Sequence, residues 1–195
     1  IRNVLYAKAY ARHRYGLELE PLQLTDIPGF IPQLPQICAG LGIRNLVLTR
    51  CAPPDTLFWF ESPGGQRVLA WSAKGYNQAG GYGAHLDLNA MRQRGLADRL
   101  AAQAKSGVPP LFYYGSDQWL PPPGMASAVR AWNAEASQQQ QLAMATPTAY
   151  FRTLRAAGVA EKAPVLHGWQ ARRLPGWQFD DLARPGGQAS AFPDH

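Results

Sequence analysis

LQLTDIPGF, at residues 22–30, passes from an apolar strand-like run directly into Asp26, and LFYYGSD, at residues 111–117, places Asp117 in the same way. In a parallel α/β sheet the loops that leave the carboxyl ends of the strands line one face, where catalytic groups gather. Two carboxylates on that face indicate acid–base or nucleophile chemistry. The structural alternative is that each aspartate only shapes a turn, because an Asp side chain bonds nearby backbone N–H groups.

Helical and strand-like segments alternate along the rest of the chain. Apolar residues at spacings of three and four predict helices over residues 2–15, 32–42, 87–106, 125–136 and 146–154. Short apolar runs predict strands within residues 17–24, 46–48, 57–61, 67–71, 111–114, 142–145 and 164–167. The turn sequence SPGG joins two of these strands into a predicted β-hairpin. The alternation predicts an α/β fold with a mainly parallel sheet.

The composition is that of a soluble globular domain, with 46% hydrophobic and 16% charged residues. The net charge of +6 comes from scattered basic residues, so the chain is not expected to bind nucleic acid. No run of about 18 apolar residues is present to span a bilayer, and no membrane partner is expected. Two cysteines are too few for a disulfide scaffold or a CxxC metal site, and Cys38 is expected to be a buried free thiol.

Several segments, in this order, resemble the catalytic domain of glycoside hydrolase family 38, the α-mannosidases. They are DIPGFIPQLPQI at 26–37, GI at 42–43, FWFESPGGQRVL at 58–69, GYN at 75–77, GSD at 115–117 and TPTAYFRTL at 146–154. The resemblance implies a (β/α) barrel-like catalytic domain, with residues 1–170 forming part of it and residues 171–195 a Pro/Gly-rich continuation. The chain has no initiator Met and starts within a predicted helix, so it is expected to be an incomplete fragment.

The resemblance also implies roles for individual residues. Asp26 matches the family's catalytic nucleophile, which is also a zinc ligand, and Asp117 matches the proposed general acid/base. Arg50, Tyr76 and Asn77 match residues near the sugar and are expected to bind substrate. A retaining glycosidase needs one carboxylate to form the glycosyl-enzyme and a second carboxyl group to protonate the leaving oxygen. The two aspartates are therefore expected to converge in space.

Aromatic rings and histidines supply the remaining candidates. Any of six tryptophans could stack on a sugar face, and Trp119 is singled out because it lies two residues beyond Asp117. His13, His85 and His167 form no HxH or HxxxH pair, so we expect each to be a surface or core residue rather than a metal ligand.

Zinc is the expected cofactor, although the chain departs from the family pattern around it. Pro28 stands where the family has Phe, Phe30 follows the glycine, and the family's N-terminal His-x-Asp ligands have no counterpart. A catalytic zinc site normally uses three or more protein ligands, and Asp26 supplies one. We expect the parent protein to bind zinc and this chain alone to bind it poorly.

The predicted function is that of a zinc-dependent, retaining α-mannosidase that hydrolyses terminal α-mannosyl linkages of glycans or oligosaccharides. Its expected partner is therefore a carbohydrate substrate. Two alternatives stay open. One is a non-catalytic carbohydrate-binding module or pseudoenzyme with the same fold, and the other is a metal-dependent deacetylase of related fold, which would need a His-rich ligand set.

Overall fold

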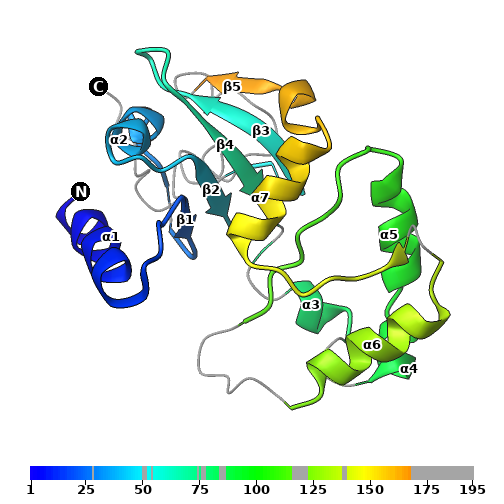
Figure 1. Ribbon diagram of the computed structural model, residues 1–195. Coiled ribbons are helices and arrows are strands. Elements are labelled where there is room, and N and C mark those ends of the chain that lie inside the picture. Colours follow the sequence, from blue (N-terminus) through cyan, green and yellow to red (C-terminus); the bar gives the residue numbers. More distant parts are fainter. Residues whose placement is uncertain are drawn as a thin grey trace, which may run out of the picture. The chain divides into compact units, whose positions relative to one another are not determined.

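The computed structural model describes residues 1–27, 29–49, 52–53, 55–73, 75, 78–83, 87–115, 123–137 and 140–167. The chain divides into two compact units (Figure 1). The first comprises residues 1–72 and 160–195, and the second comprises residues 73–159. No helix in the described part of the chain is long and apolar enough to cross a membrane.

A five-stranded sheet forms the centre of the first unit. Its strands are β1 (Pro21–Leu24), β2 (Asn45–Leu48), β3 (Thr56–Glu61), β4 (Arg67–Ser72) and β5 (Val165–His167). They lie in the order β1-β2-β4-β3-β5 (Figure 1). The pairs β1–β2, β2–β4 and β3–β5 are parallel, and the β3–β4 hairpin is antiparallel. The predicted α/β fold with a mainly parallel sheet is confirmed, and closure into a barrel stays a prediction.

The hairpin turn forms where the sequence predicted it. Ser62 N–H donates to Gln66 O at 2.9 Å, and Gly65 N–H donates to Ser62 O at 2.9 Å. Gly65 has a φ of 81°, a left-handed conformation that glycine adopts without a Cβ clash. The turn thus fixes the β3–β4 register, in which Glu61 pairs with Arg67.

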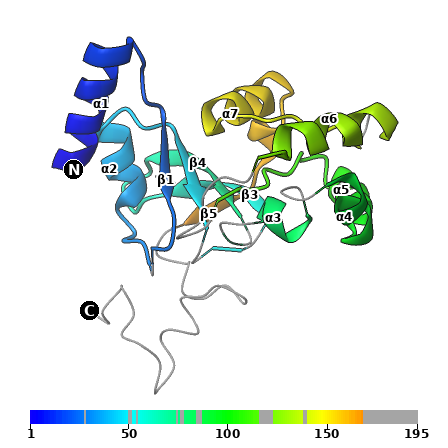
Figure 2. The same cartoon turned by 90° about the horizontal axis from the view of Figure 1, so that it is seen from below.

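The first unit contains two helices, α1 (Arg2–Tyr15) and α2 (Leu34–Gly40), and α2 packs on β3 and β4. They lie next to one another beside β1 in both views (Figures 1 and 2). Helix α1 ends at Gly16, which has a φ of 64° and whose N–H donates to Arg12 O, as the sequence predicted. Helix α2 is shorter than the predicted 32–42 segment and keeps Pro35 in its first turn, where the missing N–H costs nothing.

Alternate residues of the strands form the core on the face that α2 covers. They share near-complete burial and pack with residues of α2 and its flanking loops: Phe30, Cys38, Ile43, Leu46, Leu48, Ala52, Phe58, Phe60, Val68 and Ala70. Cys38 is a free, buried thiol, as predicted, and burial raises its pKa to about 11. This thiol is therefore protonated and unreactive at neutral pH.

Phe58 offers a test of this core, because its side chain is fully buried in the middle of β3. We expect Phe58→Ala to lower the free energy of unfolding by about 3–5 kcal/mol, through lost burial and the cavity left behind. Tyr6→Ala is the matched control, because Tyr6 is 67% exposed on α1 and its removal should change stability by less than about 0.5 kcal/mol. Denaturant unfolding measures both, and similar losses for the two variants would contradict this description of the core.

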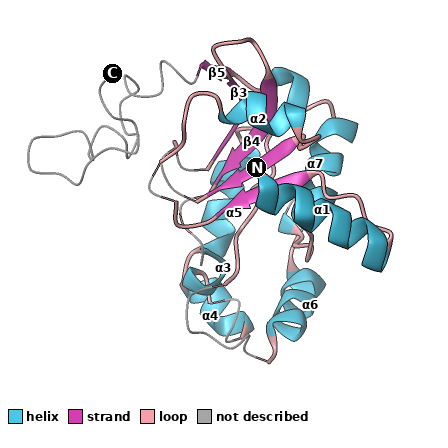
Figure 3. Ribbon diagram, turned by 90° about the vertical axis from the view of Figure 1, so that its left-hand side faces the viewer, coloured by secondary structure: helices cyan, strands magenta, loops and turns pink. Residues whose placement is uncertain are grey.

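The second unit consists of helices and loops in the part described (Figure 3). Its helices are α3 (Gln78–Gly81), α4 (Leu88–Gln93), α5 (Leu96–Ala104), α6 (Met125–Glu135) and α7 (Pro147–Ala156). Asp87 caps α4 by accepting a hydrogen bond from Ala90 N at 2.8 Å, and Thr146 caps α7 by accepting from Ala149 N at 3.2 Å. Both caps follow from their sequence signals.

Three sequence predictions in the second unit were wrong. The single helix predicted over 87–106 is divided between α4 and α5 at Gly95, whose φ of 72° is not helical. Residues 111–114 form no strand, and they follow two prolines, which lack the N–H that a strand donates. Residues 142–145 also form no strand. The side-chain amide of Asn133 accepts a hydrogen bond from Leu142 N–H at 2.8 Å and donates one to Leu142 O at 2.7 Å. These are the two backbone groups of Leu142 that would otherwise pair with a neighbouring strand.

Candidate active site

The candidate nucleophile Asp26 lies just beyond the carboxyl end of β1. Strand β1 pairs in parallel with β2, and Leu24 lies opposite Leu48 in this register. The residues that follow the two strands are therefore neighbours. Asp26 N–H donates a hydrogen bond to Thr49 Oγ1 at 3.1 Å. The sheet thus places Asp26 at the edge where ligands bind in parallel α/β folds.

The backbone of Asp26 adopts an uncommon conformation. Its φ is 57°, in the left-handed region, and Asp55 is the other non-glycine residue with a positive φ among the described residues. A left-handed conformation costs about 1–2 kcal/mol in an L-residue, and aspartate tolerates it better than most. Such conformations persist only where the surroundings enforce them, and they cluster at functional sites. Asp26 is an exposed residue.

The loop that follows Asp26 is anchored by an aromatic side chain. Phe30 is buried in the core cluster of the first unit. Ile27 and Ile31, on either side of it in sequence, are 36% and 46% exposed. Phe30, which departs from the family pattern, therefore fixes the loop to the sheet, and apolar side chains lie exposed near the candidate nucleophile.

Five sequence-predicted site residues lie outside the described residues: Arg50, Tyr76, Asn77, Asp117 and Trp119. Their roles stay predictions. The structure does describe Gly75 and Gly115, which precede three of them and have φ values of 119° and 148°. A residue with a Cβ would be strained at either position, which explains why glycine occurs in both the GYN and GSD segments.

The two candidate carboxylates belong to different parts of the chain. Asp26 lies in the first unit, whereas position 117 falls in the range of the second. A retaining glycosidase holds its two carboxyl groups about 5–5.5 Å apart. The convergence of Asp26 and Asp117 stays a prediction that a structure with both residues in place can measure.

The described residues do not by themselves fit a zinc site. Among them, no group of three or more His, Cys, Asp or Glu side chains could hold a metal ion. His167, one of the histidines considered as a ligand, instead bonds Glu61 through Nδ1 at 2.7 Å. The hydrogen bond from Arg67, with smaller contributions from His167, holds the pKa of Glu61 below its usual range. This cluster joins β3, β4 and β5.

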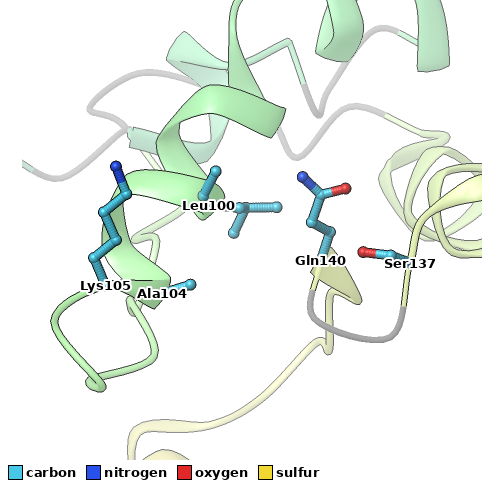
Figure 4. Close-up of a pocket in the computed structure, with 6 residues that line it drawn as sticks. Leu100, Ala104, Lys105, Ser137 and Gln140 are labelled. Carbon is cyan, nitrogen blue, oxygen red and sulfur yellow. The ribbon is translucent and has the colours of Figure 1, made fainter.

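A separate cavity of about 430 Å³ lies within the second unit (Figure 4). On one side of it lie Leu100 and Ala104 of α5 and Lys105, which directly follows that helix, and on the other side lie Ser137 and Gln140 (Figure 4). The lining contains one charged side chain, Lys105, and no carboxylate. This cavity therefore lacks the pair of carboxyl groups that glycoside hydrolysis uses.

Sequence reasoning missed Thr49. It is the residue that accepts the Asp26 N–H, and it is 4% exposed at the end of a fully buried strand. Its position in the sequence could have indicated it. Thr49 comes directly after the apolar run 46–48, just as Thr25 and Asp26 come directly after β1.

The structure defines an α/β domain with an aspartate just beyond the end of β1, and comparison with known proteins gives its family. The family model described as "Glycosyl hydrolases family 38 N-terminal domain" matches residues 1–178. The chain belongs to this family, which confirms the resemblance seen in the sequence.

A solved structure shares the fold. The crystal structure of an alpha-mannosidase from Enterococcus faecalis V583 superimposes with a TM-score of 0.70 at 16% sequence identity. The match covers 86% of this chain and 19% of the alpha-mannosidase chain, so this chain spans about a fifth of the length of that protein. No curated protein sequence matches the chain.

Proposed function

We propose that the whole protein, meaning this chain with any sequence that continues it, is a retaining α-mannosidase that acts on terminal α-mannosyl linkages of glycans or oligosaccharides. The observation that carries the proposal is the family match over residues 1–178, which includes an exposed aspartate held at the carboxyl end of β1. The mannosidase with the same fold supports the substrate class.

In the proposed reaction the Asp26 carboxylate attacks the anomeric carbon and forms a covalent glycosyl-enzyme. Asp117 protonates the leaving oxygen in this step and then takes a proton from the water that hydrolyses the intermediate. Two displacements at one carbon retain its configuration. An exposed aspartate just beyond a strand end suits the first role, because the nucleophile must reach the sugar without reorganising the sheet.

Substrate contacts are proposed for residues that directly follow residues of known position. Arg50 directly follows Thr49, and Tyr76 and Asn77 directly follow Gly75. We propose that these three side chains hydrogen-bond the sugar and that Trp119 stacks on its apolar face, as aromatic rings do in carbohydrate sites.

The stereochemistry of the first product tests this proposal. The whole protein should hydrolyse an aryl α-mannoside, and proton NMR should detect α-mannose as the first anomer formed. The matching β-mannoside, used as a control, should not be cleaved. Formation of β-mannose first would exclude the retaining mechanism, and mannose binding without turnover would favour the non-catalytic carbohydrate-binding alternative.

Zinc is proposed as the cofactor of the whole protein, with Asp26 as one ligand. The remaining ligands would come from residues outside the described part, because the described residues contain no three-ligand cluster. No step of the mechanism above depends on the metal.

For the 195-residue chain alone, we expect well below one zinc per chain after dialysis, and little or no mannosidase activity with or without added zinc. One carboxylate ligand binds zinc weakly, whereas catalytic sites supply at least about three protein ligands. Elemental analysis measures the metal, and the Asp26→Asn variant of the same chain is the control for adventitious binding. One zinc per chain that is lost in this variant would show that the ligands lie within the chain, and His85 would then be the first residue to substitute.

A further inference from the structure

Thr49 contacts the backbone of the candidate nucleophile. The Thr49 hydroxyl oxygen accepts the Asp26 N–H at 3.1 Å across 23 residues of sequence. Thr49 is 4% exposed, so water competes little for this bond. The contact joins the loop after β1 to the residue after β2.

The two ends of this contact differ in how firmly the sheet holds them. Strand β2 lies between β1 and β4, is paired on both sides and is buried along its whole length. Strand β1 is at the edge of the sheet and is only partly buried. Thr49 is therefore attached to an inner strand, whereas Asp26 follows an edge strand. Groups on rigid inner elements are suited to hold a functional loop in place.

The backbone of Asp26, which donates the hydrogen bond to Thr49, has a left-handed conformation. With a φ of 57°, Asp26 is in a region that an L-residue leaves readily for negative φ unless its surroundings prevent it. A change of φ at Asp26 would redirect the carboxylate and move the loop that follows. The hydrogen bond from Asp26 N–H to Thr49 holds the peptide plane on the N-terminal side of Asp26, the plane from which φ is measured.

We propose that Thr49 is a positioning residue that fixes the left-handed backbone of Asp26 and so aims its carboxylate at the anomeric carbon. This inference rests on the proposed function, in which Asp26 is the nucleophile. Thr49 touches neither substrate nor reacting atoms in this role. Its effect on the reaction is transmitted only through the Asp26 amide.

Two variants separate the hydroxyl from the shape of the side chain. Thr49→Val keeps the branched shape and removes the acceptor, and Thr49→Ser keeps the acceptor. In the whole protein we expect Thr49→Val to lower kcat on an aryl α-mannoside by about 10- to 100-fold, with a smaller change in KM. Thr49→Ser should recover most of kcat. A purely structural role would instead lower the melting temperature and leave kcat of the folded fraction unchanged.

Ser72 provides the matched control. It is fully buried at the carboxyl end of β4, directly opposite Leu48, and its Oγ has no hydrogen-bond partner among the described residues. Ser72→Ala also removes a buried hydroxyl from this edge of the sheet, but it leaves the Asp26 contact intact. We expect kcat of this variant to match that of the unmodified protein.

Hydrogen exchange supplies a readout that does not depend on catalysis. Mass spectrometry of overlapping peptides can follow the Asp26 amide, which should exchange slowly in the unmodified protein and in Thr49→Ser, and faster in Thr49→Val. Unchanged exchange in Thr49→Val, or unchanged kcat, would overturn the inference. If the unmodified protein cleaves no α-mannoside, the proposed function fails, and the exchange measurement alone then decides whether Thr49 fixes the Asp26 backbone.

Discussion

Asp26→Ala should abolish hydrolysis of an aryl α-mannoside by the whole protein. The substitution removes the carboxylate that forms the glycosyl-enzyme, so kcat should fall by roughly 10⁴- to 10⁶-fold, the range seen when one member of a catalytic unit is lost. Steady-state assays at saturating substrate measure the effect. The loss should occur without unfolding, because Asp26 is exposed and its hydrogen bond to Thr49 uses the backbone N–H.

Asp55→Ala is the control that this structure offers. Asp55 also has a left-handed backbone, with a φ of 55°, and lies in the same unit as Asp26. Both alanine variants therefore carry the same kind of backbone strain, whereas only one removes the proposed nucleophile. Asp55→Ala should keep its activity. Full activity in Asp26→Ala, or an equal loss in both variants, would contradict the assignment of Asp26.

Asp117→Asn should lower kcat in proportion to the demand for leaving-group protonation. General acid catalysis contributes about 10²- to 10⁴-fold, and that contribution matters most when the leaving group is poorly acidic. The variant should therefore hydrolyse a mannobiose far more slowly than the unmodified protein does. For an aryl mannoside with an acidic phenol, the rate of the first step should fall much less. The measurement is kcat/KM on both substrates, for the unmodified protein and the variant.

An equal loss on the two substrates would show that Asp117 does not act as the acid. It would favour the structural alternative, in which this aspartate only bonds the backbone of the turn after Gly115. Because Asn has nearly the same size as Asp, a difference between the two proteins reports on the loss of the acidic proton and not on a change of shape.

Local signals predicted the elements that depend on local chemistry. Gly16 ends α1, Asp87 and Thr146 cap their helices, and SPGG forms the hairpin turn, because each of these features needs only neighbouring residues. The alternation of helices and apolar runs likewise predicted the mainly parallel sheet. The helix end, the caps and the turn are encoded within a few residues of where they occur.

Features that depend on residues elsewhere in the chain were not predicted from the sequence. The run at 142–145 has a strand-like pattern, yet the side chain of Asn133 hydrogen-bonds both backbone groups of its first residue, Leu142. Thr49 was missed for a similar reason, since its contact with Asp26 exists only because of the β1–β2 register. The position of Asp26 after β1 was predictable from the apolar run before it, whereas its left-handed backbone was not.

The central claim is that Asp26 is the nucleophile of a retaining glycosidase, and covalent trapping tests it most directly. A fluorinated mannosyl fluoride that forms the glycosyl-enzyme faster than water hydrolyses it should inactivate the whole protein. Peptide mass spectrometry then locates the attached sugar. The account predicts a mannosyl ester on Asp26 that is absent from Asp26→Ala, and an ester on any other residue would contradict it.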